Sequence, residues 1–310
     1  GHPGAGFPYP VPVRIALTGG TGFVGSHLTA LLSEQGHELV LISRGRRVRR
    51  ATRPNVRLVR ADVVSGSGLV EALAGCDAVV HLVAIIVERG SQTFERVNRQ
   101  GTANVARAAR EAGLAHLVHL SALGADPDPH FAYLASKWAG EQAILISGVP
   151  HTIVRSSLIF GPGDGFFTKL TKLVRRTPPM APLPIAGDGR TLFQPIAVQD
   201  VARCIATALE RGPSGQAIEI GGPDHLSYEQ IIDIIKGQVV VLPRINVHVP
   251  VMAIKPMAAV MAKLFRDPMV TPSQLDLLGR NNITITEAVR TAFGFTPRRF
   301  AESCAYLRDY

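Results

Sequence analysis

The stretch VRIALTGGTGFVGSHLTALLSEQG (13–36) joins an apolar run to a helix-like run through closely spaced glycines. The first part, VRIALTG (13–19), predicts a strand that is buried in a parallel sheet. The last part (23–36) predicts a helix that Gly36 ends. Between them, the pattern G-x-x-G-x-x-G (19–25) allows a tight turn and a close approach of the backbone to a pyrophosphate at the helix N-terminus. The stretch therefore predicts a nucleotide-binding strand–turn–helix unit.

Strand-like and helix-like segments continue to alternate outward from this stretch. Further strands are predicted at 38–44, 56–62, 78–86, 114–123 and 150–161, and helices at 68–74, 93–113 and around YLASK (133–137). Alternation at this spacing is typical of doubly wound α/β proteins, so we predict a parallel Rossmann sheet with helices on both faces.

The character of the chain changes after about residue 160, where loops become longer and strands shorter. We predict a dinucleotide-binding Rossmann domain at 11–160 that also receives 190–220. Residues 161–189 and 221–310 are predicted to form a smaller, mostly helical substrate lobe. Ligands of open α/β sheets bind at the carboxyl ends of the strands, so this lobe is expected to cover that edge.

The composition is that of a globular chain, with 310 residues of which 46% are hydrophobic and 18% charged. Its three cysteines (Cys76, Cys204 and Cys304) are odd in number and widely spaced, which fits neither a disulfide framework nor a metal site and favours a reducing cytosol. The first residues lack the basic and apolar regions of a secretory signal, and no uncharged apolar run reaches the roughly 18 residues that span a bilayer. We therefore expect a cytoplasmic protein that is at most peripheral to a membrane.

The end of the second predicted strand indicates which nucleotide binds. NAD sites usually place an acidic residue here for the ribose hydroxyls, but this chain has Ser43 and Arg44, followed by Arg46. An arginine can bind a 2′-phosphate with two hydrogen bonds and can stack on adenine. We therefore predict NADP(H) as the preferred cofactor, with NAD(H) as the alternative.

Eight arginines between Arg44 and Arg60 contribute much of the formal net charge of +9. Such charge indicates an anionic partner without identifying it. Beyond Arg44 and one neighbour, we interpret these arginines as a general basic face, with a site for nucleic acid or anionic lipid as the alternatives, and we expect no nucleic-acid partner. Asp62, which ends the third predicted strand, either meets the adenine edge or caps a turn.

A tyrosine and a lysine lie one helical turn apart in YLASK (133–137), after the strand that ends at Ser121. The Asp-Pro pair at 128–129 predicts the start of the helix, so Tyr133 is expected near its N-terminus and Lys137 on its face. Reduction of a carbonyl needs a proton donor at the oxygen, and a nearby ammonium lowers the pKa of a tyrosine from its usual value of about 10. These three residue types therefore suit a carbonyl–alcohol interconversion.

The order of the motifs resembles that of extended and atypical short-chain dehydrogenase/reductases. The shared motifs are TGGTGFVG (18–25), HLVA (81–84), NRQGTANV (98–105), Ser121, Y-x-x-x-K (133–137), GPGD (161–164) and RTLFQPIAVQDVA (190–202). The chain is most similar to the atypical branch that contains an NAD(P)H-binding accessory subunit of respiratory complex I and its bacterial relatives. That similarity is carried by RSSLIFGPGDGFF (155–167) and PLPIAGDGRTLFQPIAVQDVA (182–202). The chain departs from the pattern in a short loop after Ser121, and in Arg155-Ser156 where relatives commonly have Arg-Pro.

This resemblance implies a role for each residue of the site. Tyr133 would be the acid–base, Lys137 its partner and Ser121 the hydroxyl that orients the substrate, while Asn98 would support the site or lie on a helix surface. Metal ligands are not expected. The residues predicted to bind the cofactor are Gly19, Thr21, Gly22, Phe23, Val24, Gly25, Ser43, Arg44, Arg46, Asp62, Val63, Leu82, Val83, Ala84, Asn98, Lys137, Arg155 and Ser157.

Three functions are compatible with these motifs. The first is an NADP(H)-dependent oxidoreductase that acts on a small-molecule carbonyl or alcohol. The second is a scaffold or redox sensor that binds NADP(H) without turnover, associated with a respiratory or membrane complex. The third is a sugar-nucleotide epimerase or dehydratase, which would usually pair NAD with an acidic second-strand end. The presence of Tyr133, Lys137 and Ser121 together favours chemistry, and either a monomer or a homodimer is expected.

Two other features have simpler structural interpretations. His81, His116 and His119 lie in or beside apolar strands without a complement of carboxylates or cysteines, so we predict satisfied strand histidines rather than metal ligands. The Met-rich segment 247–265 predicts a helix pair packed in the core. Its alternative is an exposed apolar face for a membrane surface, a lipophilic substrate or a protein partner.

Overall fold

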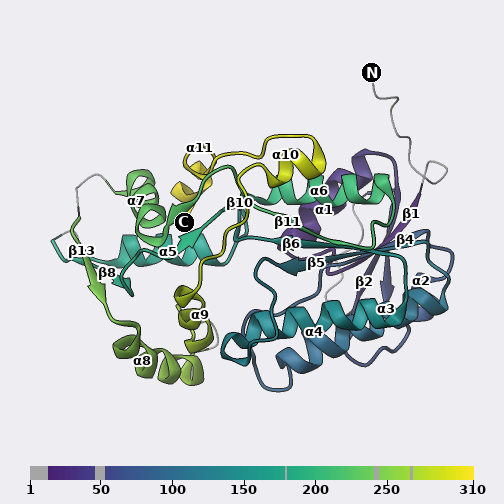
Figure 1. Cartoon of the computed structure of the whole chain (residues 1–310), viewed down its shortest axis with the longest axis horizontal. Helices are drawn as coiled ribbons and strands as arrows, with labels where there is room; N and C mark the ends of the chain where they lie inside the picture. Colours follow the sequence, from purple (N-terminus) through teal and green to yellow (C-terminus); the bar gives the residue numbers. More distant parts are fainter. Residues whose placement is uncertain (1–12, 46–52, 179, 241–243, 266–267) are drawn as a thin grey trace. The chain divides into compact units, whose positions relative to one another are not determined.

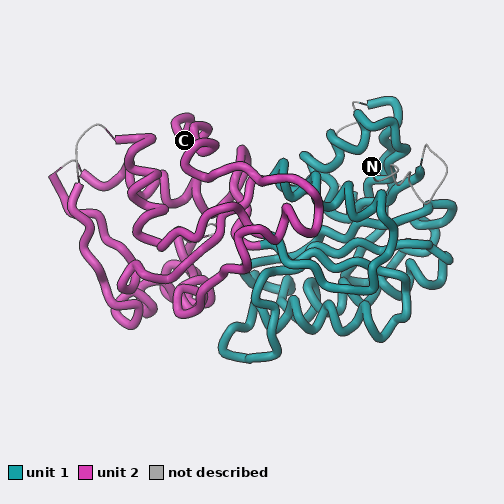
Figure 2. Tube along the Cα trace, turned by 45° about the horizontal axis from the view of Figure 1, so that its top comes forward, with its two compact units in different colours: residues 1–156, 198–220 teal, residues 157–197, 221–310 magenta. Residues whose placement is uncertain are grey.

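The computed structural model describes residues 13–45, 53–178, 180–240, 244–265 and 268–310. Arg46, which the sequence predicts to bind the cofactor, lies outside the described residues. The chain forms two compact units, which Figure 2 shows in different colours: residues 1–156 with 198–220, and residues 157–197 with 221–310. Among the described residues, no helix combines the length and the apolar character that crossing a membrane requires.

The first unit is built on a seven-stranded sheet with the order β11-β6-β5-β4-β1-β2-β3, in which all neighbouring strands are parallel. Its strands are β1 (Arg14–Thr18), β2 (Glu38–Ser43), β3 (Val56–Arg60), β4 (Ala78–His81), β5 (His116–Ala122), β6 (His151–Ser156) and β11 (Ala217–Ile220). This is the Rossmann order with one further strand beside β6, and the order reverses between β1 and β4. The predicted doubly wound sheet is confirmed.

Helices cover both faces of this sheet (Figure 1). The helices of the first unit are α1 (Phe23–Glu34), α2 (Leu69–Leu73), α3 (Gly101–Glu111), α4 (Ala132–Ser147) and α6 (Val198–Arg211). α1 packs beside α6, while α2, α3 and α4 form the layer on the other face. The core between that layer and the sheet contains Val79, Val105, Leu117 and Ile144, each fully buried, because the strands carry apolar side chains toward both helix layers.

The apolar run at 78–86 forms a shorter strand than the sequence predicts, since β4 ends at His81. Beyond it, the backbone of Val83 packs on the glycine turn, with its nitrogen 3.2 Å from the position that a Cβ on Gly19 would take. The side chain of Asn98 then replaces the sheet partners of Ile85, because its Oδ1 accepts from the Ile85 N–H (2.8 Å) and its Nδ2 donates to the Ile85 carbonyl (2.9 Å). The predicted helix 93–113 is likewise divided into a π-helix, η1 (Glu95–Gln100), and α3.

The second unit has shorter elements around an aromatic core. Its described residues form three strand pairs: β7 (Ile159–Phe160) with β10 (Ile196–Ala197), β8 (Leu183–Ala186) with β13 (Asn246–Val249), and β9 (Leu192–Phe193) with β12 (Leu226–Ser227). Its helices are α5 (Phe166–Arg176), α7 (Tyr228–Val239), α8 (Val251–Leu264), α9 (Pro272–Asp276), η3 (Leu277–Gly279), α10 (Ala288–Phe293), α11 (Phe300–Ser303) and η4 (Ala305–Asp309). Phe160, Phe167 and Phe300 are buried against one another, with ring centroids 4.7 to 6.1 Å apart.

The Met-rich segment 247–265 does not form the predicted helix pair in the core. It contains the end of β13 followed by the single helix α8, on which Ala258 is the one buried residue. Met252 is 85% exposed and Met257 60% exposed. The prediction was wrong because α9, a helix of five residues, is too short to cover α8 along its length.

Candidate functional site

The glycine turn after β1 leaves a helix N-terminus without a side-chain cap. Gly19 has φ +77°, and a Cβ on Gly25 would lie 2.1 Å from the Gly19 carbonyl oxygen, so the first turn of α1 packs directly on the turn backbone. Gly22 is the N-cap of α1, with no capping side chain and no acidic residue in the first turn. The first N–H groups of a helix lack intrahelical acceptors, and the helix dipole favours an anion there. The turn therefore has the shape and the polarity that a diphosphate requires.

A pocket of about 290 Å³ lies at the carboxyl ends of β1 to β4, beside the glycine turn. Seven of its lining residues are among those predicted to bind the cofactor: Gly19, Thr21, Ser43, Arg44, Val63, Val83 and Ala84. The sequence did not predict the other six: Ile42, Ala61, Val64, Ile85, Gln92 and Val97. The lining combines apolar side chains with polar groups at Thr21, Ser43, Arg44 and Gln92, as small-molecule pockets usually do.

Arg44 is held at the rim of this pocket by a residue from a distant loop. When the amide oxygen of Gln92 faces the guanidinium, it accepts from Arg44 Nη1 at 2.8 Å and from Nη2 at 3.1 Å. A second arginine, Arg60, ends β3 in register with Ser43, and its side chain packs against Gly45. The strand register could have indicated Arg60, whereas no sequence signal distinguishes Gln92 from other loop residues. These arginines place positive charge at the end of β2, where a carboxylate would favour NAD.

Asp62 lies just beyond β3 and takes part in a turn. Its Oδ1 accepts from the Val64 N–H at 3.0 Å, and its backbone carbonyl accepts from the Gly66 N–H at 2.8 Å. Asp62 is not among the residues that line the pocket, whereas Val63 and Val64 are. Of the two roles predicted for Asp62, capping a turn is therefore the one that its contacts in this structure support.

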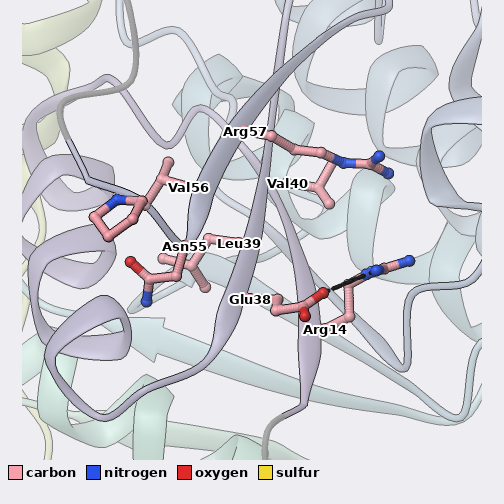
Figure 3. Close-up of a pocket in the computed structure, with 8 residues that line it drawn as sticks. Arg14, Glu38, Leu39, Val40, Asn55, Val56 and Arg57 are labelled. Atoms are coloured by element: carbon pink, nitrogen blue, oxygen red, sulfur yellow. Dashed lines mark hydrogen bonds and ion pairs between the residues drawn. The ribbon is translucent and has the colours of Figure 1, made fainter.

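A larger hollow of about 410 Å³ lies at the opposite edge of the sheet, where β1, β2 and β3 begin (Figure 3). Its charged residues include Arg14 and Glu38, which form an ion pair at 2.8 Å, and the exposed Arg57. None of the predicted site residues lines this hollow. Its place at the amino ends of the strands separates it from the glycine turn.

The predicted catalytic residues lie at the end of β5 and in the first turns of α4. Asp128 accepts from the His130 N–H (2.9 Å) and starts η2 (Pro129–Phe131), so that Tyr133 is the second residue of α4. Lys137 is only 3% exposed, and its Nζ donates to the Leu120 carbonyl of β5 at 2.8 Å. Ser121 is 5% exposed, and among the described residues no group bonds to its Oγ. The fold therefore brings Lys137 next to the strand end that carries Ser121.

Burial shifts the pKa of both titratable residues of this group. It raises the pKa of Tyr133 to about 12. The centroid of the Tyr133 ring lies 6.0 Å from that of the Phe94 ring. The sequence-based expectation of a lowered tyrosine pKa was wrong, because desolvation dominates and the Lys137 ammonium is directed to the Leu120 carbonyl. Burial also lowers the pKa of Lys137 to about 8, against the opposite effect of the Glu141 carboxylate.

Asn98 ties the loop after β4 to helix α4. Besides its two bonds to Ile85, its Nδ2 donates to Ser136 Oγ at 2.9 Å, and that hydroxyl donates to the Tyr133 carbonyl at 2.6 Å. A Cβ on Gly140 would lie 2.8 Å from the Asn98 carbonyl oxygen, so α4 and η1 are in backbone contact here. Asn98 is 1% exposed, which makes it a buried support of the site rather than a helix-surface residue.

The remaining predicted residues lie outside the pocket. Gly22, Phe23, Val24 and Gly25 belong to the start of α1, and Leu82 follows β4. Arg155 makes a two-pronged ion pair with the buried Glu141, at 2.6 to 3.2 Å, which joins β6 to α4. Ser157 belongs to the second unit, where its Oγ donates to Asn282.

Comparison with known proteins identifies the family. Residues 15–221 match the model of the NAD dependent epimerase/dehydratase family. This chain belongs to that family. The predicted resemblance to extended short-chain dehydrogenase/reductases, and to the branch with a complex I subunit, is thereby confirmed.

Two curated relatives and one solved structure illustrate the range of the family. The chain is 28% identical, over 78% of its length, to NADH dehydrogenase [ubiquinone] 1 alpha subcomplex subunit 9 of Arabidopsis thaliana. It is 34% identical, over 53% of its length, to the ceramide reductase of Caulobacter vibrioides. It spans only 61% and 52% of these two proteins, respectively. UDP-glucuronic acid 4-epimerase of Bacillus cereus, solved with UDP-glucuronic acid and NAD, has the same fold, with a TM-score of 0.73, 22% identity and coverage of 96% of this chain and 98% of that one.

Proposed function

We propose that this protein is an NADP(H)-dependent oxidoreductase of the short-chain dehydrogenase/reductase type, in which Tyr133 exchanges a proton with the oxygen of a carbonyl or alcohol. The observation that carries the proposal is the unpartnered Oγ of Ser121 beside the anchored Lys137. A buried hydroxyl without a partner costs roughly 1–3 kcal/mol. Such a cost is explained if the hydroxyl bonds to a ligand oxygen.

The residues of the pocket fit NADP(H). The uncapped start of α1 fits the diphosphate, and the pocket beside it, with both apolar and polar groups in its lining, fits the adenosine half. Arg44, held by Gln92, supplies donors for a 2′-phosphate, and Arg60 brings a second positive charge to the same strand ends. A free 2′-hydroxyl would find no carboxylate among the described residues that line the pocket.

The chemistry assigned to the chain's own residues is a proton transfer. When bound, NADPH would supply a hydride to the carbonyl carbon, and the carbonyl oxygen would gain negative charge at the same time. Tyr133 remains protonated at neutral pH because burial raises its pKa, and the alkoxide that forms is the stronger base. The proton therefore passes from Tyr133 Oη to the substrate oxygen, the Ser121 hydroxyl donates to that oxygen, and the Tyr133 phenolate regains a proton from solvent.

Cofactor preference is tested by titration with NADPH and NADH. Arg44→Ala removes charge-assisted hydrogen bonds worth about 1.5–3 kcal/mol, so NADPH binding should weaken about 10- to 100-fold while NADH binding changes little. Arg57→Ala is the matched control, because it removes an arginine at the opposite edge of the sheet. Equal affinity of the wild type for both cofactors would refute the 2′-phosphate assignment.

Turnover is tested with NADPH and long-chain ketones, because the Caulobacter relative is named a ceramide reductase. Tyr133→Phe should lower the rate about 10²- to 10⁴-fold without loss of NADPH affinity. Tyr228→Phe, which alters a buried tyrosine of the second unit, should retain activity. A Tyr133→Phe variant as active as the wild type would exclude the acid–base role.

A non-catalytic NADP(H)-binding subunit is the second candidate. It is supported by the Arabidopsis relative, which is named as a subunit of NADH dehydrogenase, and by the direction of Lys137, which bonds to β5 rather than to Tyr133. Tight NADPH binding without hydride transfer to any carbonyl would favour it. Reduction of the bound oxidised nucleotide by a UDP-sugar would instead favour an epimerase, to which the family and the Bacillus neighbour point.

A further inference from the structure

Three buried polar side chains lie in one row across the sheet, behind the catalytic residues. Thr18 of β1 is in register with His81 of β4, and His81 is in register with His119 of β5. Side chains at matching positions of parallel strands point to the same face of a sheet. All three are at most 1% exposed. The row therefore forms a polar layer inside the core, next to Lys137.

His81 is fixed in one neutral form by its partners. Thr102 Oγ1 donates its only proton to the Asn98 carbonyl at 2.6 Å, so His81 Nε2 must donate to that hydroxyl oxygen at 3.0 Å. His81 Nδ1 then accepts from Thr18 Oγ1 at 2.6 Å. Both ring nitrogens of His81 therefore have a hydrogen-bond partner, so His81 presents a fixed ring surface to His119.

His119 stacks on this surface, with ring centroids 5.2 Å apart and planes inclined by 22°. Its Nε2 lies 3.4 Å from Lys137 Nζ, which also donates to the Leu120 carbonyl. An ammonium only donates, so Nε2 is the acceptor and the His119 proton is on Nδ1. Among the described residues, no group lies within hydrogen-bond geometry of that Nδ1, and the backbone of His81 has only a minor effect, which raises the pKa of His119. An orphaned buried N–H costs free energy, so the orientation of the ring is explained by Lys137 and not by packing alone.

We propose that His119 is a positioning residue, which holds the side chain of Lys137 at the end of β5 and stabilises its ammonium form. The consequence for turnover rests on the proposed function, but the contact itself does not. His119 of β5 faces Lys137, and Glu141 on the same helix raises the pKa of Lys137. Tyr133 precedes Lys137 by one helical turn. His81 lies behind His119, and Arg155 of β6 is paired with Glu141. Burial, Lys137 and His81 lower the pKa of His119, so it acts as a neutral acceptor near pH 7.

The proposal predicts the form of His119 in the wild-type protein. Long-range ¹⁵N–¹H spectra should show His119 with its proton on Nδ1 and a bare Nε2, and the Nε2 shift should follow the titration of Lys137. A spectrum with the proton on Nε2 would overturn the proposal without any substitution.

Substitutions test the effect on Lys137 directly. The chain has six lysines, so ¹⁵N-lysine spectra are simple, and Lys137→Arg assigns the Lys137 signal. His119→Phe keeps a ring on His81 but removes the acceptor, and His119→Leu is a second variant without one. In both, the acid dissociation constant of Lys137 should rise about threefold or more, because the ammonium loses an acceptor. His119→Gln, whose amide oxygen can accept, should remain near the wild-type value.

His116→Phe is the matched control, since His116 is a buried histidine of the same strand that bonds to Thr152 Oγ1 at 2.9 Å. It should leave the Lys137 titration unchanged. If His119→Phe and His116→Phe both titrate like the wild type, His119 does not position Lys137. These spectra need neither cofactor nor substrate, so failure here is distinct from failure of the NADPH and Tyr133 experiments. If the protein is a reductase, the alkaline limb of its pH profile should also move to lower pH in His119→Phe.

Discussion

Lowering the pH from 7.5 to 5 should destabilise the first unit through the histidines of β4 and β5. His81 and His116 are fully buried, and burial lowers their pKa values to about 3 and about 4. Burial also lowers the pKa of His119. In the unfolded chain each ring takes up a proton near pH 6.5. The stability from a neutral buried ring is therefore complete above pH 6.5 and is lost as the pH falls toward the folded-state pKa.

The loss at pH 5 is set by the protonation of the unfolded chain. A pH of 5 lies about 1.5 units below the unfolded-state pKa of about 6.5, and the folded rings are still neutral there. Protonation of the unfolded chain therefore favours unfolding by about 2 kcal/mol per ring. His81 and His116 together therefore contribute a loss of about 4 kcal/mol, to which His119 adds in the same direction. This is a large part of the 5–15 kcal/mol that usually stabilises a domain.

Urea unfolding at the two pH values measures this loss. The single tryptophan, Trp138, lies on α4 and reports on the first unit by its fluorescence. His116→Phe should reduce the pH-dependent loss by about 2 kcal/mol, because one ring no longer takes up a proton on unfolding. The comparison between two pH values cancels any constant cost of the substitution, and the comparison with the wild type cancels the opposite effect of Asp164, whose pKa burial raises. Leu117→Ala should destabilise the protein equally at both pH values, and an unchanged pH dependence in His116→Phe would refute the reasoning.

Three further substitutions have expected outcomes. Gly25→Ala places a Cβ 2.1 Å from the Gly19 carbonyl oxygen, and calorimetry should then detect no NADPH binding. The control is Gly237→Ala, which adds a Cβ in open space on α7. This variant should bind NADPH normally and gain about 0.5–1 kcal/mol of stability. Glu141→Gln removes the ionised partner of the Arg155 guanidinium and should cost about 3 kcal/mol in urea unfolding. This loss should exceed that of Glu34→Gln at the exposed pair with Arg53. Leu264→Gln should leave stability within about 0.5 kcal/mol, since Leu264 is 73% exposed. The expectation that 247–265 meets a membrane surface or a protein partner stays a prediction, and flotation of wild type and Leu264→Gln with phosphatidylglycerol vesicles tests it.

The nucleotide half of the site was predictable because its signals are local. A strand, a glycine turn and a helix follow one another within 13–36, and Gly22 and Gly25 pack on the Gly19 carbonyl within that segment. Arg44 follows the same logic, since it ends the next strand. Gln92 and Arg60 were missed because their positions depend on a loop path and on strand register, which bring together residues that are far apart in the sequence.

The half of the candidate site that contains Tyr133 and Lys137 shows a different limit. The spacing of Tyr133 and Lys137 correctly places both on one helix, but their pKa values depend on how deeply the helix is buried. An apolar run also predicts strand where the chain has already left the sheet, as at 82–86, because Asn98 supplies the hydrogen bonds that a neighbouring strand would. Periodicity reports the apolar environment of a segment, and tertiary contacts decide which polar groups satisfy its backbone.

The same distinction separates the two candidate functions. The glycine turn and Arg44 would bind NADP(H) equally well in a catalyst and in a scaffold, so they favour neither. The unpartnered Ser121 hydroxyl and the buried Lys137 ammonium both oppose folding, and apolar side chains of similar size would avoid these costs. A scaffold would gain nothing from either group, whereas a reductase needs a hydroxyl at the substrate oxygen and a cation near the phenol. The energetically unfavourable features of this site therefore support chemistry more strongly than the features that merely bind the nucleotide.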